Sequence, residues 1–395
     1  MAKRSQKTKP SKQSRRRSHG GGASRPSEGD VLAGLPSVGE LENVPGFCDV
    51  HAAPAQVAAF ETAREAVRAR LGDDVAATLE LGCVVRLDRG FPLVACEGKT
   101  LRAEHSVEFA KGASAEAGIM PTVGDWVAVA ADPTHDMGVI HEVLPRRNAF
   151  ARWRGGKRGE FQTLAANLDG VIIVAALGEG ELPCARIARS LVLVRDCGVR
   201  PSVVLTKADR KASEADLASD VERVRRLAGE EADVVVTSSL EGEGLDAVRA
   251  LVPEGHVAMI LGESGAGKST LLNALLGADA LATNAVRERD DMGRHTTVAR
   301  MMVKIPGAGV ICDAPGLRSL PLVGHERGLA KAFPEISELA ETCRFRDCTH
   351  GSEPGCAVRE AEAAGELDEV RLEAYLALAA EMRASAATLD PDVVI

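Results

Sequence analysis

A glycine-rich segment in the middle of the 395-residue chain contains the residue types that bind phosphate. Its glycines and its lysine follow the spacing G-x-x-x-x-G-K-S. Glycines in such a loop let backbone N–H groups turn toward phosphate oxygens, and the N-terminus of a following helix adds positive potential. Lys268 can neutralise the outer phosphates, while the Ser269 hydroxyl can bind Mg²⁺. The segment therefore predicts a nucleotide phosphate-binding loop made of Gly262, Glu263, Ser264, Gly265, Ala266, Gly267, Lys268, Ser269 and Thr270.

The residues on either side of this loop support the prediction. The apolar run 257–261 is typical of a buried strand, and the leucines that follow Thr270 recur at helical spacing. Strand, glycine-rich turn and helix form the context in which the motif binds phosphate. The alternative, a flexible glycine–serine turn with a chance lysine, would require neither neighbour.

A second segment, Thr206, Lys207 and Asp209, follows the apolar run 201–205 and has the pattern T-K-x-D. In guanine-binding phosphate-loop proteins, an aspartate at this place accepts hydrogen bonds from the guanine N1–H and the 2-amino group. Adenine lacks both donors, so the carboxylate would be left unpaired at a large cost. The lysine stem would cover the base plane. The segment therefore indicates a guanine nucleotide.

Three further segments have the chemistry that a GTPase needs. The first ends the next predicted strand, where a backbone amide can meet the guanine oxygen. The second has little apolar character and suits a mobile switch whose threonine reaches Mg²⁺ and the γ-phosphate. The third follows a strand, and its aspartate can hold the metal through water while its glycine amide contacts the γ-phosphate. In chain order they contain Ser238 and Ser239, then His295 and Thr297, then Asp313 and Gly316.

The residue that orients the attacking water is the least defined part of this site. Many GTPases have a glutamine directly after the D-x-x-G segment, but here the residue is Leu317, and leucine cannot polarise water. Slow intrinsic hydrolysis, accelerated by another residue or by a partner, is therefore expected. His295 is the candidate for orienting water, and its alternative role is to shape the loop. The predicted catalytic residues are His295, Thr297 and Lys268, and the predicted Mg²⁺ ligands are Ser269, Thr297 and Asp313.

The order of these segments is itself informative. In the usual GTPase order the phosphate loop comes first, whereas here the base segments near 206 and 238 precede the loop at 262. A circular permutation explains this order. Its consequence is that the switch at Asp313 continues directly into the domain that follows.

That following domain contains three cysteines and one histidine within fourteen residues: Cys343, Cys348, His350 and Cys356. Four nitrogen and sulfur ligands with no vacancy are what a structural, tetrahedral Zn²⁺ requires. A redox pair is the alternative, but it does not account for the histidine. One Zn²⁺ per chain is therefore predicted, and later apolar residues at helical spacing indicate helices packed on this site. The domain is expected to contact a partner.

Composition limits the possible locations and partners. The net charge is −9, yet residues 1–30 contain nine Lys/Arg and two acids, a balance of +7 that leaves −16 for the rest. Such a tail either meets a polyanion such as nucleic acid or is a solvated, disordered extension. No apolar run approaches the roughly 20 residues that cross a bilayer, so a cytoplasmic protein without a membrane partner is expected.

Short apolar runs separated by turn residues between about 79 and 152 predict a small all-β barrel, and its length fits a five-stranded oligonucleotide-binding (OB) fold. It has few aromatic residues, so RNA contact would depend on shape and charge. The basic residues from Arg146 to Arg158 could supply that charge or form an exposed linker.

The expected organisation is a disordered basic tail (1–40), a short helical extension with a helix at 54–71 (41–78), an OB-fold barrel (79–155), an α/β circularly permuted GTPase domain (160–325) and a small zinc-binding helical domain (326–395).

From residue 79 to 375 the chain resembles the ribosome-small-subunit-dependent GTPase A family of bacteria. The marks are the permuted segments above together with residues 123–127, 145–148, 293–297, Phe345 and 353–356. The resemblance implies late maturation of the small ribosomal subunit, with binding to 16S rRNA and ribosomal proteins. It also implies that the subunit stimulates hydrolysis of GTP to GDP and that the factor is then released; a monomer is expected. Thr206 stands where asparagine is commoner, which removes an amide that can connect the base segment to the phosphate loop.

Two other hypotheses belong to different functional classes. An RNA-binding assembly platform could hold the nucleotide only as a structural ligand, and mutation of Lys268 would then leave ribosome maturation intact. A phosphate-loop kinase that uses ATP is disfavoured by Asp209.

Overall fold

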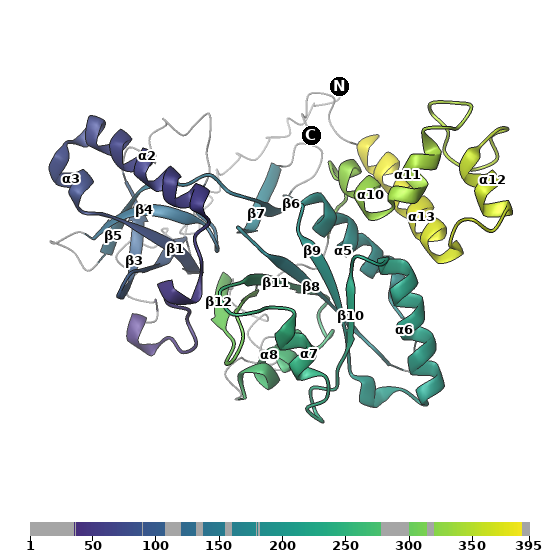
Figure 1. The fold of residues 1–395 in the computed structure, drawn as a ribbon, viewed down its shortest axis with the longest axis horizontal. Coiled ribbons are helices and arrows are strands. Elements are labelled where there is room, and N and C mark those ends of the chain that lie inside the picture. Colours follow the sequence, from purple (N-terminus) through teal and green to yellow (C-terminus); the bar gives the residue numbers. More distant parts are fainter. Residues whose placement is uncertain are drawn as a thin grey trace, which may run out of the picture. The chain divides into compact units, whose positions relative to one another are not determined.

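The computed structural model describes residues 35, 37–88, 90–106, 120–131, 137–154, 160–178, 180, 182–277, 300–313 and 320–388. Most of the predicted basic tail lies outside this range. Figure 1 shows the arrangement of the elements. Among the described residues, no helix is both long and apolar enough to cross a membrane.

The first sheet region is a closed barrel. Its strands are β1 (Leu79–Asp88), β2 (Phe91–Cys96), β3 (Lys99–His105), β4 (Trp126–Ala131) and β5 (Met137–Val143). They pair in the order β1-β2-β3-β5-β4, and β4 pairs again with β1, which closes the barrel. Buried valines and Ile140 fill one side of these strands. The predicted barrel is confirmed. Its strand β3 was not predicted, because it has no clear apolar pattern in the sequence.

The predicted helix at 54–71 is observed as α2 (Pro54–Leu71), followed by α3 (Asp73–Ala77). Short 3₁₀ turns, η1 (Val38–Glu40) and η2 (Phe47–Asp49), precede it. Phe60 and Val67 bury the apolar side of α2, while its Gln56 donates to the Asn167 side chain at 2.8 Å. Asn167 in turn donates to the Gly124 carbonyl at 2.8 Å. The helix is thereby bonded to the segment that leads into the next domain.

Two of the basic residues after the barrel form ion pairs within the protein. Arg146 donates to both carboxylate oxygens of Asp125 at 2.7 Å, and Asp125 is completely buried. Arg147 donates to Asp169 at 2.6 Å. The expectation that this stretch supplies charge to RNA is therefore wrong for Arg146, whose charge is neutralised within the fold. The residues that follow form a hairpin of β6 (Ala149–Arg154) and β7 (Glu160–Ala166), which the sequence did not indicate.

The second sheet region is the α/β domain. Its strands are β8 (Gly170–Ala176), β9 (Arg200–Thr206), β10 (Asp233–Val236), β11 (Val257–Gly262), β12 (Arg300–Lys304) and β13 (Val310–Asp313). Their order is β10-β9-β8-β11-β13-β12; the first five strands are parallel to one another, and β12 is antiparallel to β13. The strand that precedes the phosphate loop, β11, therefore lies inside the sheet. At the far edge β12 also pairs with β1, with Leu87 opposite Arg300, so the sheet continues into the barrel.

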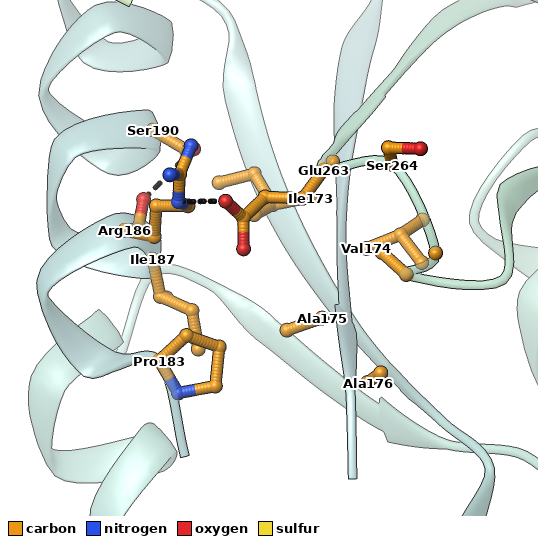
Figure 2. A pocket seen from close by; sticks show the side chains of 13 residues that line it. Ile173, Val174, Ala175, Ala176, Pro183, Arg186, Ile187, Ser190, Glu263 and Ser264 are labelled. Atoms are coloured by element: carbon orange, nitrogen blue, oxygen red, sulfur yellow. Dashed lines mark hydrogen bonds and ion pairs between the residues drawn. The ribbon is translucent and has the colours of Figure 1, made fainter. Parts of the chain in front are cut away.

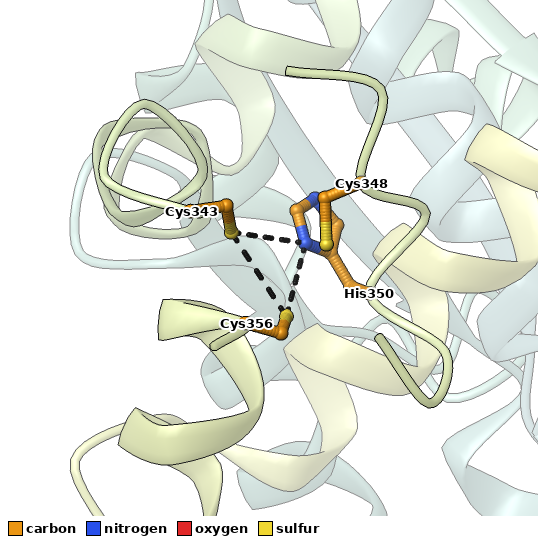
Figure 3. A group of neighbouring side chains, drawn as sticks. All are labelled: Cys343, Cys348, His350 and Cys356. Atoms are coloured by element: carbon orange, nitrogen blue, oxygen red, sulfur yellow. Dashed lines mark hydrogen bonds between the residues drawn. The ribbon is translucent and has the colours of Figure 1, made fainter. Parts of the chain in front are cut away.

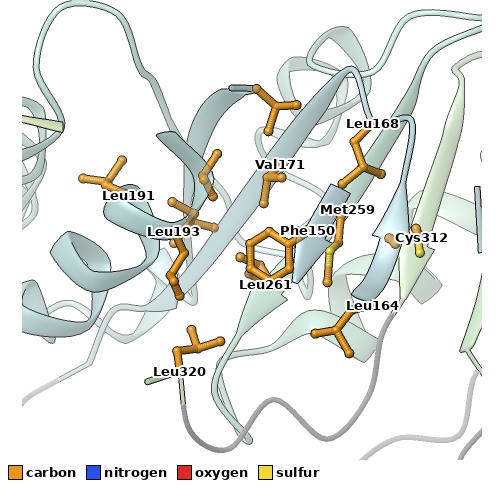
Figure 4. Close-up of a cluster of buried hydrophobic side chains, with 14 of the residues drawn as sticks. Phe150, Leu164, Leu168, Val171, Leu191, Leu193, Met259, Leu261, Cys312 and Leu320 are labelled. Atoms are coloured by element: carbon orange, nitrogen blue, oxygen red, sulfur yellow. The ribbon is translucent and has the colours of Figure 1, made fainter. Parts of the chain in front are cut away.

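Helices cover both faces of this sheet because residues of each strand alternate between the faces. Ile173 and Leu261 pack in one cluster with Leu191 of α5 (Cys184–Asp196), as Figure 4 shows in part. This cluster also includes residues of α6 (Glu214–Ala228). Ile172 and Ile260 point to the other face. There they pack with residues of α7 (Leu245–Ala250) and α8 (Lys268–Leu276).

The C-terminal region consists of α10 (Glu326–Ala332), α11 (Pro334–Ala340), α12 (Ala357–Ala363) and α13 (Glu369–Ala386). Arg371 of α13 connects several of these parts. It donates to the Glu335 carboxylate at 2.6 and 3.0 Å, to the Ala332 carbonyl at 2.9 Å and to the Leu227 carbonyl of α6 at 2.8 Å. The C-terminal helices are therefore anchored to the α/β domain.

We predict that Arg146→Met lowers the free energy of unfolding by roughly 3 kcal/mol, because it leaves the buried Asp125 charge without its partner. Urea unfolding followed by tryptophan fluorescence measures this, since Trp126 is adjacent to Asp125. Arg70→Met is the control, because its pair with Glu142 at 3.2 Å is about one third exposed and should contribute about 1 kcal/mol or less. Equal losses in the two variants would contradict the prediction.

Candidate nucleotide and metal sites

The predicted phosphate loop connects β11 to α8, so the strand, turn and helix occur in the order that the motif predicts. Gly262 has a φ of 154°, and a Cβ atom there would lie 2.5 Å from the Val174 carbonyl oxygen. Gly267, with a φ of 91°, caps the N-terminus of α8. The Lys268 ammonium donates to the carbonyls of Gly262 at 2.6 Å and Glu263 at 2.7 Å. These bonds hold its positive charge against the loop that would receive phosphates.

The T-K-x-D segment is hydrogen-bonded to this loop. The buried Thr206 hydroxyl donates to the Ala266 carbonyl at 2.7 Å, and the Lys207 ammonium donates to the Gly265 carbonyl at 2.6 Å. Burial, and then the nearby Arg210 charge, lowers the pKa of Lys207, although Asp209 opposes this. The expected loss of a connection at Thr206 is therefore not observed, because its hydroxyl makes the bond to the loop.

The aspartate of this segment has a side-chain partner from the next loop. The buried Ser238 hydroxyl donates to Asp209 Oδ1 at 2.8 Å, while Asp209 itself is exposed in the middle of the short helix η3 (Ala208–Arg210). The Ser238 backbone N–H donates to the Glu243 carbonyl at 3.2 Å. Ser238 is therefore placed to orient the aspartate through its side chain, a role that the sequence did not reveal.

Asp313 reaches the same edge of the sheet as the phosphate loop. It is buried at the end of β13 and lies opposite Ile260 of β11 in a parallel pair. Parallel neighbours end on the same side, so Asp313 and the phosphate loop lie at the same edge of the sheet. Ser269 lies in the first turn of α8 and is buried. The predicted residues His295, Thr297 and Gly316, and the glutamine-position residue Leu317, are outside the described residues.

One residue beside the loop was missed in the sequence. Arg186 of α5 forms an ion pair with Glu263 of the phosphate loop, next to a cavity of about 290 Å³ (Figure 2). Nothing in the spacing of the motifs identifies this arginine. The available signal was Glu263 itself, because an acidic residue in an anion-binding loop calls for a compensating cation.

The cysteines and the histidine predicted to bind metal converge (Figure 3). The ligand atoms of Cys343, Cys348, His350 and Cys356 all lie within 4.8 Å of one another. Cys343 Sγ is 3.9 Å from Cys356 Sγ, and His350 Nδ1 is 3.7 and 3.5 Å from these two sulfurs. Tetrahedral ligands at bond lengths of about 2.3 Å for sulfur and 2.0 Å for nitrogen would be about 3.5 to 3.8 Å apart. The group can therefore hold a metal ion.

The residues around this group fix the loop that carries the histidine. His350 has a φ of 60°, and its carbonyl accepts a hydrogen bond from Arg359 at 2.6 Å. The Glu353 carboxylate accepts from the Thr349 hydroxyl at 2.6 Å and from the Gly351 amide at 2.8 Å. Hydrogen bonds from the Thr349 side chain and from backbone amides lower the pKa of Glu353 to about 2. The carboxylate is therefore ionised at neutral pH and holds the turn around His350.

The combined architecture defines a class of protein. A barrel precedes a parallel sheet in which the base segment comes before the phosphate loop, and helices with a Cys₃His group follow; this is a circularly permuted GTPase with two flanking domains. Residues 143–323 match the RsgA GTPase family. The small ribosomal subunit biogenesis GTPase RsgA of Streptomyces coelicolor is 44% identical over 309 residues, which cover 78% of this chain and 82% of that protein. The chain belongs to the RsgA GTPase family.

Other comparisons agree with this assignment. The protein of the same name from Methanosarcina acetivorans is 40% identical over 271 residues, covering 69% of this chain and 72% of that one. The crystal structure of YjeQ from Thermotoga maritima superposes with a TM-score of 0.58 at 27% identity, covering 77% of this chain and 99% of that one. YloQ, a circularly permuted GTPase, has a TM-score of 0.55 at 24% identity over 78% of this chain and 96% of that one, and it shows the shared fold.

We predict that Thr206→Val makes the phosphate loop more mobile, because the Ala266 carbonyl loses the hydroxyl that donates to it. Amide hydrogen exchange in residues 263–267 should become roughly tenfold faster. Mass spectrometry of peptides from this loop measures the change, and Thr206→Ser, which keeps the hydroxyl, should exchange like the wild type. Unchanged exchange in Thr206→Val would show that the hydrogen bond does not restrain the loop.

Proposed function

We propose that this chain is a GTPase that acts in late maturation of the small (30S) ribosomal subunit. The observation that carries the proposal is the bonding of a guanine-type T-K-x-D segment to the phosphate loop through Thr206 and Lys207. The names of its relatives supply the ribosomal context. The subunit stimulates hydrolysis in this proposal, and the factor leaves once GTP has become GDP.

In the proposed site the chain residues divide into four tasks. Asp209, oriented by Ser238, accepts hydrogen bonds from the guanine edge, and the Ser239 amide meets the guanine oxygen. The loop amides and the Lys268 ammonium hold the β- and γ-phosphates. Mg²⁺ supplies charge neutralisation at the phosphates when bound. Ser269, Thr297 and Asp313 would hold Mg²⁺, Gly316 would contact the γ-phosphate, and His295 would orient the attacking water.

The proposed partners follow from the same assignment. The 16S rRNA and ribosomal proteins of the small subunit are the binding surface for the barrel and for the C-terminal helices. The protein works as a monomer in the cytoplasm, where ribosomes are assembled. The proposed domains are the barrel at 79–155, the GTPase at 160–325 and the metal-binding domain at 326–395, preceded by the extension at 41–78 and the basic tail at 1–40.

We propose Zn²⁺ as the metal of the Cys₃His group, because three thiolates and one imidazole at tetrahedral spacing are typical of structural zinc. The ion would join the loop at Cys343 to the start of α12 at Cys356. Its chemical contribution is structural, since four protein ligands leave no open position.

Purified protein should contain about one Zn²⁺ per chain, and Cys348→Ser should contain much less. Metal analysis by mass spectrometry measures the content, and thermal unfolding should show a lower Tm for the variant. Cys48→Ser is the matched control, because Cys48 is an exposed free cysteine outside the group. Wild-type protein with far less than one zinc and an unchanged Tm in Cys348→Ser would refute the zinc assignment.

GTP turnover should be slow alone and should rise by about tenfold or more with purified 30S subunits, while ATP should not replace GTP. Phosphate release measures both rates. Lys268→Ala should lose most turnover, whereas Lys304→Ala, which removes a half-exposed lysine paired with Asp49, should keep it. Equal turnover with and without subunits would reject the proposal, and normal ribosome maturation in cells with Lys268→Ala would favour a nucleotide that is only a structural ligand.

A further inference from the structure

The phosphate loop contains a carboxylate where it binds anions. Glu263 is the residue after Gly262, and its backbone carbonyl accepts a hydrogen bond from the Lys268 ammonium at 2.7 Å. This lysine is the residue that reaches the β- and γ-phosphates in such loops. Glu263 therefore belongs to the part of the loop near the outer phosphates. Without compensation its negative charge would repel a nucleotide, and the repulsion would increase with the number of phosphates.

The compensating charge comes from Arg186. Its guanidinium forms an ion pair with the Glu263 carboxylate across the edge of the cavity between α5 and the loop (Figure 2). The two side chains are 45% and 42% exposed, so the pair is accessible to solvent but is not fully screened. Among the ion pairs of the described residues, Arg186 is the one residue of α5 that pairs with the Glu263 carboxylate.

The position of Arg186 on its helix supports a specific role for this pair. Arg186 lies in the first turn of α5, where the helix dipole disfavours a positive charge. Its backbone is fixed, because its amide donates to the Pro183 carbonyl at 3.0 Å and its carbonyl accepts from the Ser190 hydroxyl at 2.9 Å. Two charges that would each be unfavourable alone thus neutralise each other beside the phosphate loop.

We propose that Arg186 neutralises Glu263 and thereby determines how strongly the phosphate loop prefers GTP over GDP. The inference rests on the proposed GTPase function and deepens it. Arg186 is a specificity-determining residue that acts through Glu263. The charge of Glu263 affects the affinity for GTP more than the affinity for GDP. The reason is that the additional γ-phosphate adds negative charge at the end of the nucleotide that Lys268 contacts.

The test is a double-mutant cycle on the full-length protein. Dissociation constants for fluorescent N-methylanthraniloyl GTP and GDP are measured with Mg²⁺ present at low salt. Arg186→Met should weaken GTP binding about three- to fivefold more than GDP binding, and Glu263→Gln should shift the preference toward GTP. The double variant Arg186→Met/Glu263→Gln should have nearly the wild-type preference for GTP over GDP. The single variant Arg186→Lys keeps the positive charge and should keep most of that preference. Higher salt should reduce all of these shifts.

Arg195→Met is the matched control, because Arg195 lies on the same helix and pairs with Glu231 at 2.8 Å. It is nine residues from Arg186, about 14 Å along the helix axis, so it should not change the nucleotide preference. The proposal is overturned if Arg186→Met shifts the preference no more than Arg195→Met does. It is also overturned if the double variant prefers GTP as weakly as Arg186→Met alone.

Two further readouts separate this inference from other failures. If Arg186→Met unfolds, as judged by its Tm, the Glu263→Gln variant alone decides, since the proposal requires its preference to move toward GTP. If wild-type protein binds neither guanine nucleotide, the proposed GTPase function fails. If wild-type protein binds both and the preference does not respond to the charge changes, only the role of Arg186 fails.

Discussion

The bonding of the base segment to the phosphate loop is the constraint on which the rest of this structure depends. The two segments are about sixty residues apart, and Thr206 and Lys207 join them through carbonyls of Ala266 and Gly265 at 2.7 and 2.6 Å. In this permuted chain the base segment precedes the loop, so the two segments meet only through the tertiary structure. The central sheet makes this possible, because β9 and β11 flank β8 and their carboxyl ends share one edge.

Helix α5 connects this edge to the C-terminal helices. Its first turn directs Arg186 to Glu263 of the phosphate loop. One turn later, Arg189 donates to the Leu320 carbonyl at 3.1 Å and pairs with Glu381 of α13. At its end, Asp196 accepts from the buried His325, at 2.8 Å, just before α10. Helix α5 therefore contacts both the phosphate loop and the C-terminal region that carries the metal group.

The predictions succeeded where a local pattern is sufficient and failed where a partner is distant. The helix at 54–71 follows from its apolar spacing, and it is observed with those bounds as α2. Strand β3, which contains Lys99, Arg102 and Glu104, has no such apolar spacing. It forms because it pairs with β2 and β5, and these partners cannot be read from its own sequence. Arg146 looked like an RNA-facing charge in the sequence. Only the fold shows that the completely buried Asp125 requires it.

The sequence by itself predicted the chemistry of this protein: a phosphate loop, a guanine-type segment before it, and four side chains close together in the chain that can hold a metal ion. Such motifs are local because a loop or a short turn positions their atoms. The tertiary structure decided which side chains support them. The Thr206 hydroxyl replaces an expected amide, Ser238 holds Asp209, and Arg186 compensates Glu263. These partners are separated from the motif residues by about 30 to 80 positions, and no periodic pattern relates positions that only the packing of strands and helices brings together.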